Sequence, residues 1–143
     1  MERLSTAMLA LGIAITANSC NERPEVSYPD RTAAEAAGAV SRGWIPEWIP
    51  KSARQIHEMH DVDTNTSILA FRFDGNEAID LTRVCEQVSR KELPAVPLRA
   101  SWWPNDVPPS DLATHRHVYY SCDSGEAYLA ISTQQGEAYY WRP

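Results

Sequence analysis

The last third of the chain alternates hydrophobic and polar residues in three short runs. These runs cover 116–122, 127–132 and 138–142, and Asp-Ser-Gly and Gln-Gln-Gly turns separate them. Alternation with a period of two is typical of strands with one buried face, and such turns join antiparallel neighbours. The pattern therefore predicts an antiparallel meander.

Further strands are expected earlier in the chain. The run 67–73 places Phe71 and Phe73 on one face, as in a half-buried strand. The stretch 52–62 permits two interpretations, because its apolar residues suit one side of a helix while its position before an Asp-Thr-Asn turn suits a hairpin. We predict the hairpin, which gives a sheet of about five strands.

Two helices are predicted beside this sheet. Thr32 and Glu35 form a capping-box pattern before an Ala-rich run, which predicts a helix over 32–42. The segment 79–89 has apolar residues at helical spacing, namely Leu81, Val84, Cys85 and Val88. The predicted fold class is α+β, a small antiparallel sheet of about five strands with two helices packed on one face.

Two proline-containing segments are predicted to be irregular. Residues 44–50 repeat Trp-Ile-Pro, and residues 91–112 are rich in Pro. Trp rings on stiff loops bury a large area at a small entropic cost, so they suit a binding surface. The same rings could instead cover the core. The candidate binding residues are Trp44, Trp48, Trp102 and Trp103.

Length and charge narrow the class of protein. The chain has 143 residues, 13 Lys and Arg against 19 Asp and Glu, and a formal net charge of -6. This length suits one domain with one core. Nucleic-acid binding needs clustered positive charge, and the sequence has no Lys/Arg run, so nucleic acid is not an expected partner.

The N-terminal residues have the pattern of an export signal. The mostly apolar stretch 4–17 is too short to span a bilayer and suits a cleavable signal peptide. It ends in Ala17-Asn18-Ser19-Cys20, which resembles the lipobox of bacterial lipoprotein precursors. The resemblance implies a signal peptide over 1–19 and a lipidated Cys20 as the new N-terminus. An ordinary signal peptide remains the alternative.

That resemblance also implies a location and an organisation of the chain. Asn21, rather than Asp, follows the Cys, which by similarity to the sorting rule of enteric bacteria points to the periplasmic side of the outer membrane. The polar residues 20–30 are expected to be a flexible tether, with one globular domain over 31–143. In an oxidising compartment Cys85 and Cys122 would form a disulfide; two buried free thiols are the alternative.

A second resemblance concerns the domain itself. The pattern Pro50-Lys51-Ser52-Ala53-x-x-Ile56, followed by Phe71-x-Phe73, resembles small uncharacterised envelope lipoproteins. It implies two strands leading into a helix and brings no known activity.

Other motifs give weaker indications of metal binding or catalysis. The pairs His57 and His60, and His115 and His117, could supply metal ligands, although solvated side chains explain them equally well. The run 61–65 resembles the start of a calcium loop, but Thr66 and Arg72 stand where Gly and Glu are needed. The Asp-Ser-Gly at 123–125 resembles a serine-protease nucleophile, while a hairpin turn explains it more simply.

These observations lead to a non-enzymatic module of the bacterial envelope. We expect no cofactor, a membrane partner through the lipid on Cys20, and an envelope protein or glycan as the ligand of the domain. One alternative is an inhibitor or immunity protein that neutralises a periplasmic toxin or hydrolase. The other is a metal-dependent enzyme using the four His residues: His57, His60, His115 and His117.

Overall fold

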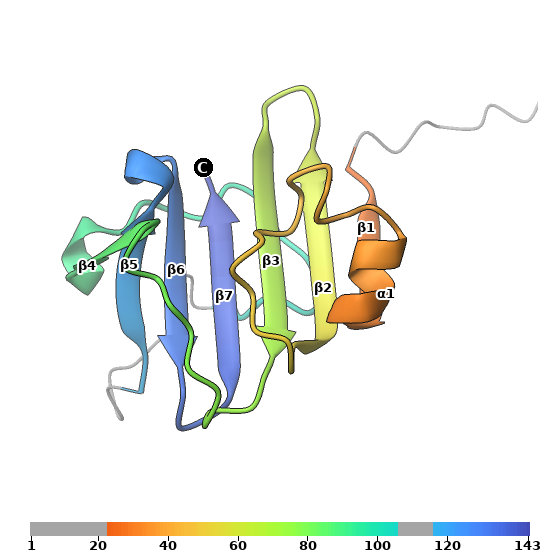
Figure 1. The fold of residues 1–143 in the computed structure, drawn as a ribbon. Helices are drawn as coiled ribbons and strands as arrows, with labels where there is room; N and C mark the ends of the chain where they lie inside the picture. The colour runs from red at the N-terminus through yellow and green to blue at the C-terminus, as the bar shows by residue number, and fades with distance from the viewer. Residues whose placement is uncertain (1–22, 106–115) are drawn as a thin grey trace, which may run out of the picture.

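A computed structural model describes residues 23–105 and 116–143, which form one seven-stranded antiparallel sheet (Figure 1). The strands are β1 (Glu25–Asp30), β2 (Arg54–Asp61), β3 (Thr66–Arg72), β4 (Cys85–Val88), β5 (Val118–Cys122), β6 (Ala127–Ser132) and β7 (Glu137–Arg142). Their order is β1-β2-β3-β7-β6-β5-β4, so β1 and β4 form the two edges. The helical elements are α1 (Arg31–Ala36) and two 3-10 turns, η1 (Arg90–Glu92) and η2 (Asp123–Gly125).

The predicted α+β class is wrong, because the sheet has seven strands and the described residues contain one short α-helix. Residues 79–84 form turns and irregular backbone, and Cys85–Val88 form β4 where we expected a helix. The helical spacing of the apolar residues there was coincidental. β4 pairs with β5 along its whole length, and this long-range pairing overrides the local pattern.

The other predicted helix is shorter than expected. α1 begins after Asp30, whose carboxylate accepts a hydrogen bond from the backbone N–H of Ala33 at 2.8 Å. It ends at Ala36, and Gly38 then adopts a φ of +76°, a left-handed conformation that turns the chain out of the helix. The remaining residues of the predicted 32–42 helix form turns.

The prediction of a flexible tether over 20–30 is also partly wrong, because Glu25–Asp30 form the edge strand β1. Val26 and Tyr28 pack against the core, while the alternate residues Glu25, Ser27 and Pro29 are exposed. An edge strand needs apolar residues on one side only, and it tolerates Pro29 because one row of its backbone groups has no partner strand. Cleavage and lipidation at Cys20 fall outside the described residues.

The hairpin and the C-terminal meander are confirmed. β2 and β3 pair antiparallel around the turn at 62–65, and β5, β6 and β7 follow one another in the sheet. β7 also pairs with β3, which closes the two halves into one sheet. Within the described residues, no helix has the length and apolar character needed to cross a bilayer.

Irregular segments cover both faces of the sheet. In Figure 1 the segment 37–53 passes in front of β2 and β3, and the segment 89–105 runs behind the sheet. We call these sides the front face and the back face. The front core includes Ile45, Ile49, Ile56, Leu69, Phe71, Leu129 and Tyr140. The back core is formed by Met59, Ile68, Leu98, Trp103, Tyr119, Ala130 and Trp141.

The loop after β3 and the turn between β6 and β7 pack tightly around Gly75. A Cβ atom there would lie 1.9 Å from the carbonyl oxygen of Thr133. We expect Gly75→Ala to lower the free energy of unfolding by about 3 kcal/mol through this overlap. Gly43→Ala is the control, because Gly43 has a φ of +76° but no atom within 4 Å of its added Cβ, so strain alone should cost about 1 kcal/mol. Equal losses in urea unfolding would contradict the steric explanation.

Candidate functional site

The structure does not bring the candidate metal ligands together. His57 and His60 lie three residues apart on β2, so they point to opposite faces of the sheet. His117 lies near Glu137, with its Nε2 3.2 Å from the carboxylate Oε1, and His115 falls outside the described residues. Across 23–105 and 116–143, no three His, Cys, Asp or Glu side chains are placed to hold one metal ion.

The four candidate tryptophans have different environments. Trp103 is 5% exposed and belongs to the back core, where it packs edge-on against Tyr139 and Trp141. Trp48 is half-buried against Phe71 and Tyr140 in the front core. Trp44 stacks on His60, and Trp102 stacks on His57. All four therefore pack against a core, and Trp44 and Trp102 each contact a histidine in addition.

A buried acidic residue on the front face was missed by the sequence analysis. Glu58 is fully buried, and its Oε1 lies 2.5 Å from Nδ1 of His60. Its second oxygen, Oε2, has no hydrogen-bond partner within the described structure. The signal was present in the alternation of β2, because Ile56, Glu58 and His60 all fall on the same face of the strand.

The Glu58–His60 pair lies beneath a stack of side chains from the segment 37–53. The Trp44 and His60 ring centroids are 4.1 Å apart, and the guanidinium of Arg42 lies 4.3 Å from the Trp44 ring. Burial raises the pKa of Glu58, while the hydrogen bond and charge of His60 act in the opposite direction. Burial, and then the charge of Glu58, raise the pKa of Tyr28 on β1, and Arg42 opposes both.

A small cavity lies next to this pair. It has a volume of about 160 Å³, and its lining includes Trp44, His60, Asp61 and Arg142. Asp61 is held by Arg23 at 2.9 Å and accepts the backbone N–H groups of Asp63 and Thr64. The Arg23 hydrogen bond is the main cause that lowers the pKa of Asp61. The calcium-like residues 61–65 therefore act as a hairpin turn stabilised by side-chain to backbone hydrogen bonds.

A different arrangement lies on the back face, at the end of β3. A groove of about 140 Å³ is lined by Gln55, His57, Arg72, Trp102, Glu137 and Tyr139, with Ala70 and Phe71 completing the lining. We call it the His57 groove. Its side chains come from β2, β3, β7 and the segment 89–105.

Local irregularity and ring stacking position the groove residues. The pairing of β2 with β3 shifts register between Arg54 and His57, and Gln55 in this bulge has a φ of +48°. Such bulges redirect side chains, and a non-glycine residue in this conformation is strained. His57 stacks on Trp102 with ring centroids 5.5 Å apart, and its Nδ1 is 2.8 Å from Oγ of Ser27.

Opposite charges line the other side of the His57 groove. Arg72 donates to Glu137 at 3.1 Å, so the groove carries one cation and one anion in contact. Burial, followed by the charge of Glu137, raises the pKa of Tyr139. Tyr139 therefore keeps its phenol O–H at neutral pH, and the groove offers both donors and acceptors of hydrogen bonds.

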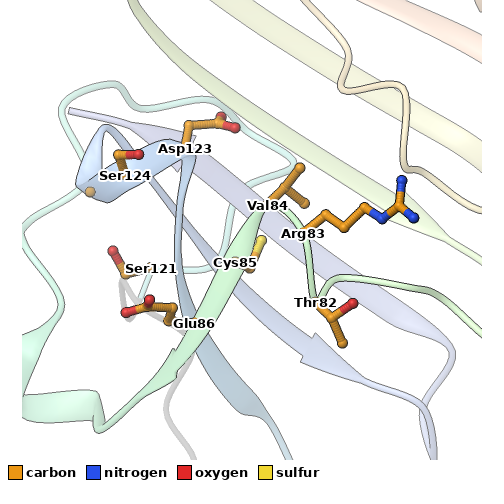
Figure 2. A pocket seen from close by; sticks show the side chains of 9 residues that line it. Thr82, Arg83, Val84, Cys85, Glu86, Ser121, Asp123 and Ser124 are labelled. Atoms are coloured by element: carbon orange, nitrogen blue, oxygen red, sulfur yellow. The ribbon is translucent and has the colours of Figure 1, made fainter.

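The third site lies beside the disulfide at the β4 edge. Cys85 and Cys122 face each other across β4 and β5 and form the expected bond. An open polar pocket of about 530 Å³ lies there. Figure 2 shows Glu86 and Ser121 on one side of Cys85 and Arg83 extending away on the other. Cys85 lines this pocket, whereas Cys122 is fully buried.

The Asp-Ser-Gly sequence in this region is a structural turn. Asp123 and Ser124 adopt φ angles of +51° and +59°, and the carboxylate of Asp123 accepts hydrogen bonds from Tyr140 at 2.9 Å and Arg142 at 3.3 Å. These contacts tie η2 to β7. Burial is the main cause that raises the pKa of Tyr140 to about 12, so its hydroxyl remains a donor to Asp123.

Comparison with known families gives one match. Residues 22–72, a little over a third of the chain, match the family model of the YbbD head domain. The matched segment contains β1, α1, the segment 37–53 and the β2–β3 hairpin. The chain matches no curated protein and no solved structure.

The match and the disulfide together define a class of protein. Disulfides persist in oxidising compartments and are rare in the cytosol. With the similarity to the YbbD head domain, the Cys85–Cys122 bond indicates a protein of the bacterial envelope or periplasm.

Proposed function

We propose that this chain is a lipid-anchored, non-enzymatic binding module, attached through Cys20 to the periplasmic side of the outer membrane. The observation that carries the proposal is the disulfide at the β4 edge, because it fits a chain exported to an oxidising space. The sequence Ala17-Asn18-Ser19-Cys20 supplies the anchor, since it resembles a lipobox.

The His57 groove is the binding surface that we assign to this module. It combines a half-buried Trp and a Tyr, both packed against the back core, with hydrogen-bonding side chains at a strained bulge, and this combination supports a ligand site. The Glu58–His60 pair is closed over by Trp44, and we give it a structural role in holding the segment 37–53 on the sheet.

Metabolic labelling with radioactive palmitate tests the anchor. We expect the wild-type chain, expressed in a Gram-negative host, to incorporate label and to sediment with the outer membrane. Cys20→Ala should abolish both, because its side chain has no sulfur to accept the lipid. Two acyl chains or more are needed for stable anchoring, so the loss of outer-membrane association should be nearly complete.

Cys85→Ala is the matched control, since it removes a cysteine that lies in the folded domain. It should leave the palmitate incorporated per molecule of chain unchanged, although loss of the disulfide lowers the stability of the domain. Equal labelling of the Cys20→Ala chain and the wild type, or a wild-type chain without label, would contradict lipid anchoring.

A further inference from the structure

The His57 groove has the size of one ring rather than of a protein partner. Its volume of about 140 Å³ is below that of pockets for drug-sized ligands, which begin near 300 Å³. A stable protein interface would bury on the order of 800 Å² on each partner, far more than such a groove provides. The ligand should therefore present one small unit at a time, as a unit of a linear polymer does.

The charges in the groove favour a neutral ligand. Arg72 pairs with one carboxylate oxygen of Glu137 at 3.1 Å, and Nε2 of His117 lies 3.2 Å from the other, so neither Arg72 nor Glu137 is an unpaired charge for an anion or a cation. Side-chain exposure is 46% for Arg72 and 19% for Glu137, which leaves hydrogen-bonding capacity at the groove surface. The guanidinium only donates and the carboxylate only accepts.

A hydroxyl group is the ligand chemistry that satisfies both partners at once, because it can accept from Arg72 while it donates to Glu137. Gln55, which the bulge of β2 places in the same groove, both donates and accepts through its amide. A row of hydroxyls on one rigid ring therefore matches these three side chains.

The aromatic side chains complete the match. Trp102 and Tyr139 give the groove apolar surface for the C–H face of a sugar ring. The indole Nε1 of Trp102 is buried and has no hydrogen-bond acceptor in the described structure. A small rotation of the indole toward the groove would let it donate to a ligand oxygen, so a bound ligand would supply the acceptor that this N–H lacks.

We propose that the His57 groove binds one unit of a neutral saccharide chain, with Gln55, Arg72 and Glu137 recognising its hydroxyls and Trp102 and Tyr139 its ring face. This inference names the ligand class of the binding module proposed above and rests on that proposal for its biological setting. The recognition itself requires no lipid anchor, which allows the two ideas to be tested separately.

The test uses the full chain carrying Cys20→Ala, purified in dodecylphosphocholine, a detergent without a sugar head. Cellohexaose, maltohexaose and chitohexaose are titrated separately and followed by the indole N–H signal of Trp102 in ¹H–¹⁵N spectra. We expect at least one of these saccharides to shift this signal in a saturable manner. Because the Cys20→Ala chain carries no covalent lipid at position 20, failure here overturns the saccharide assignment and leaves the palmitate result unaffected.

Variants assign the binding to the groove. Arg72→Ala and Gln55→Ala should each weaken binding by about tenfold or more, the loss of one or two hydrogen bonds to the ligand. Arg83→Ala is the matched control, because Arg83 lies at the disulfide pocket and not in the groove, and it should bind as the parent chain does. Circular dichroism of each variant verifies that the sheet is intact.

Two results would overturn the proposal. The first is the absence of any Trp102 shift with all three saccharides at millimolar concentration. The second is binding that Arg72→Ala and Gln55→Ala both leave unchanged. An oligoalanine peptide is titrated in parallel, and a shift with the peptide but with no saccharide would assign the groove to an extended polypeptide instead.

Discussion

Removal of the disulfide is expected to lower the free energy of unfolding by about 4 kcal/mol, since the bond closes a loop of about 38 residues. The bond joins Cys85 and Cys122, which are 37 positions apart. Without it the unfolded chain gains the entropy of that loop. The short strand β4 would also be held to the sheet by its backbone pairing with β5 alone.

The variant for this prediction carries Cys85→Ala and Cys122→Ala together, which avoids a free thiol. Urea unfolding of the purified chain, followed by Trp fluorescence, gives the free energy. The wild type in dithiothreitol is a second comparison, and it should approach the double variant. A loss below about 1 kcal/mol in both comparisons would show that the bond contributes little to stability.

Replacement of the Glu58 carboxylate by an amide is expected to raise the free energy of unfolding relative to the wild type, and the gain should grow as the pH rises. Burial raises the pKa of Glu58 in the folded chain above its unfolded value. The contribution of Glu58 to stability is therefore fully present below the unfolded pKa and is lost as the pH rises through the folded pKa. Glu58→Gln has no ionisable group at this position, so it does not lose this stability as the pH rises. Its amide keeps an oxygen that can accept a hydrogen bond from Nδ1 of His60.

Near pH 4, the Glu58→Gln variant and the wild type should unfold at similar urea concentrations. Near pH 8 the variant should be the more stable of the two, because its neutral amide avoids the desolvation cost of a buried carboxylate. Glu86→Gln, which removes an exposed carboxylate on β4, controls for the change in net charge. A stability difference for Glu58→Gln that shrinks with rising pH would contradict the direction of the pKa shift.

The sequence predicted the central strands well because their alternation records a buried face. β2, β3, β5, β6 and β7 all lie close to the predicted ranges. The two edge strands were missed for different reasons. β1 is polar on its outward side and contains Pro29, so its composition resembles that of a tether, and β4 carries apolar residues at a spacing that also fits a helix.

The candidate sites were harder to predict than the strands. The disulfide partners followed from counting cysteines, but their position opposite each other depends on the register of β4 with β5, which no local pattern contains. His57 and Trp102 were each noted as candidates, yet their stacking requires the segment 89–105 to fold over the back face. Glu58 was overlooked, because a charged residue in a strand is usually assigned to the solvent side.

The position of β1 limits how far the domain would stand from a bilayer. Glu25 follows Cys20 by five residues, and five extended residues span at most about 18 Å. If Cys20 carries the lipid, the start of β1 therefore lies within about 18 Å of the lipid attachment site. A module held this close to the bilayer would contact polymers that lie along the membrane surface to which it is anchored, and it would not reach across the periplasm.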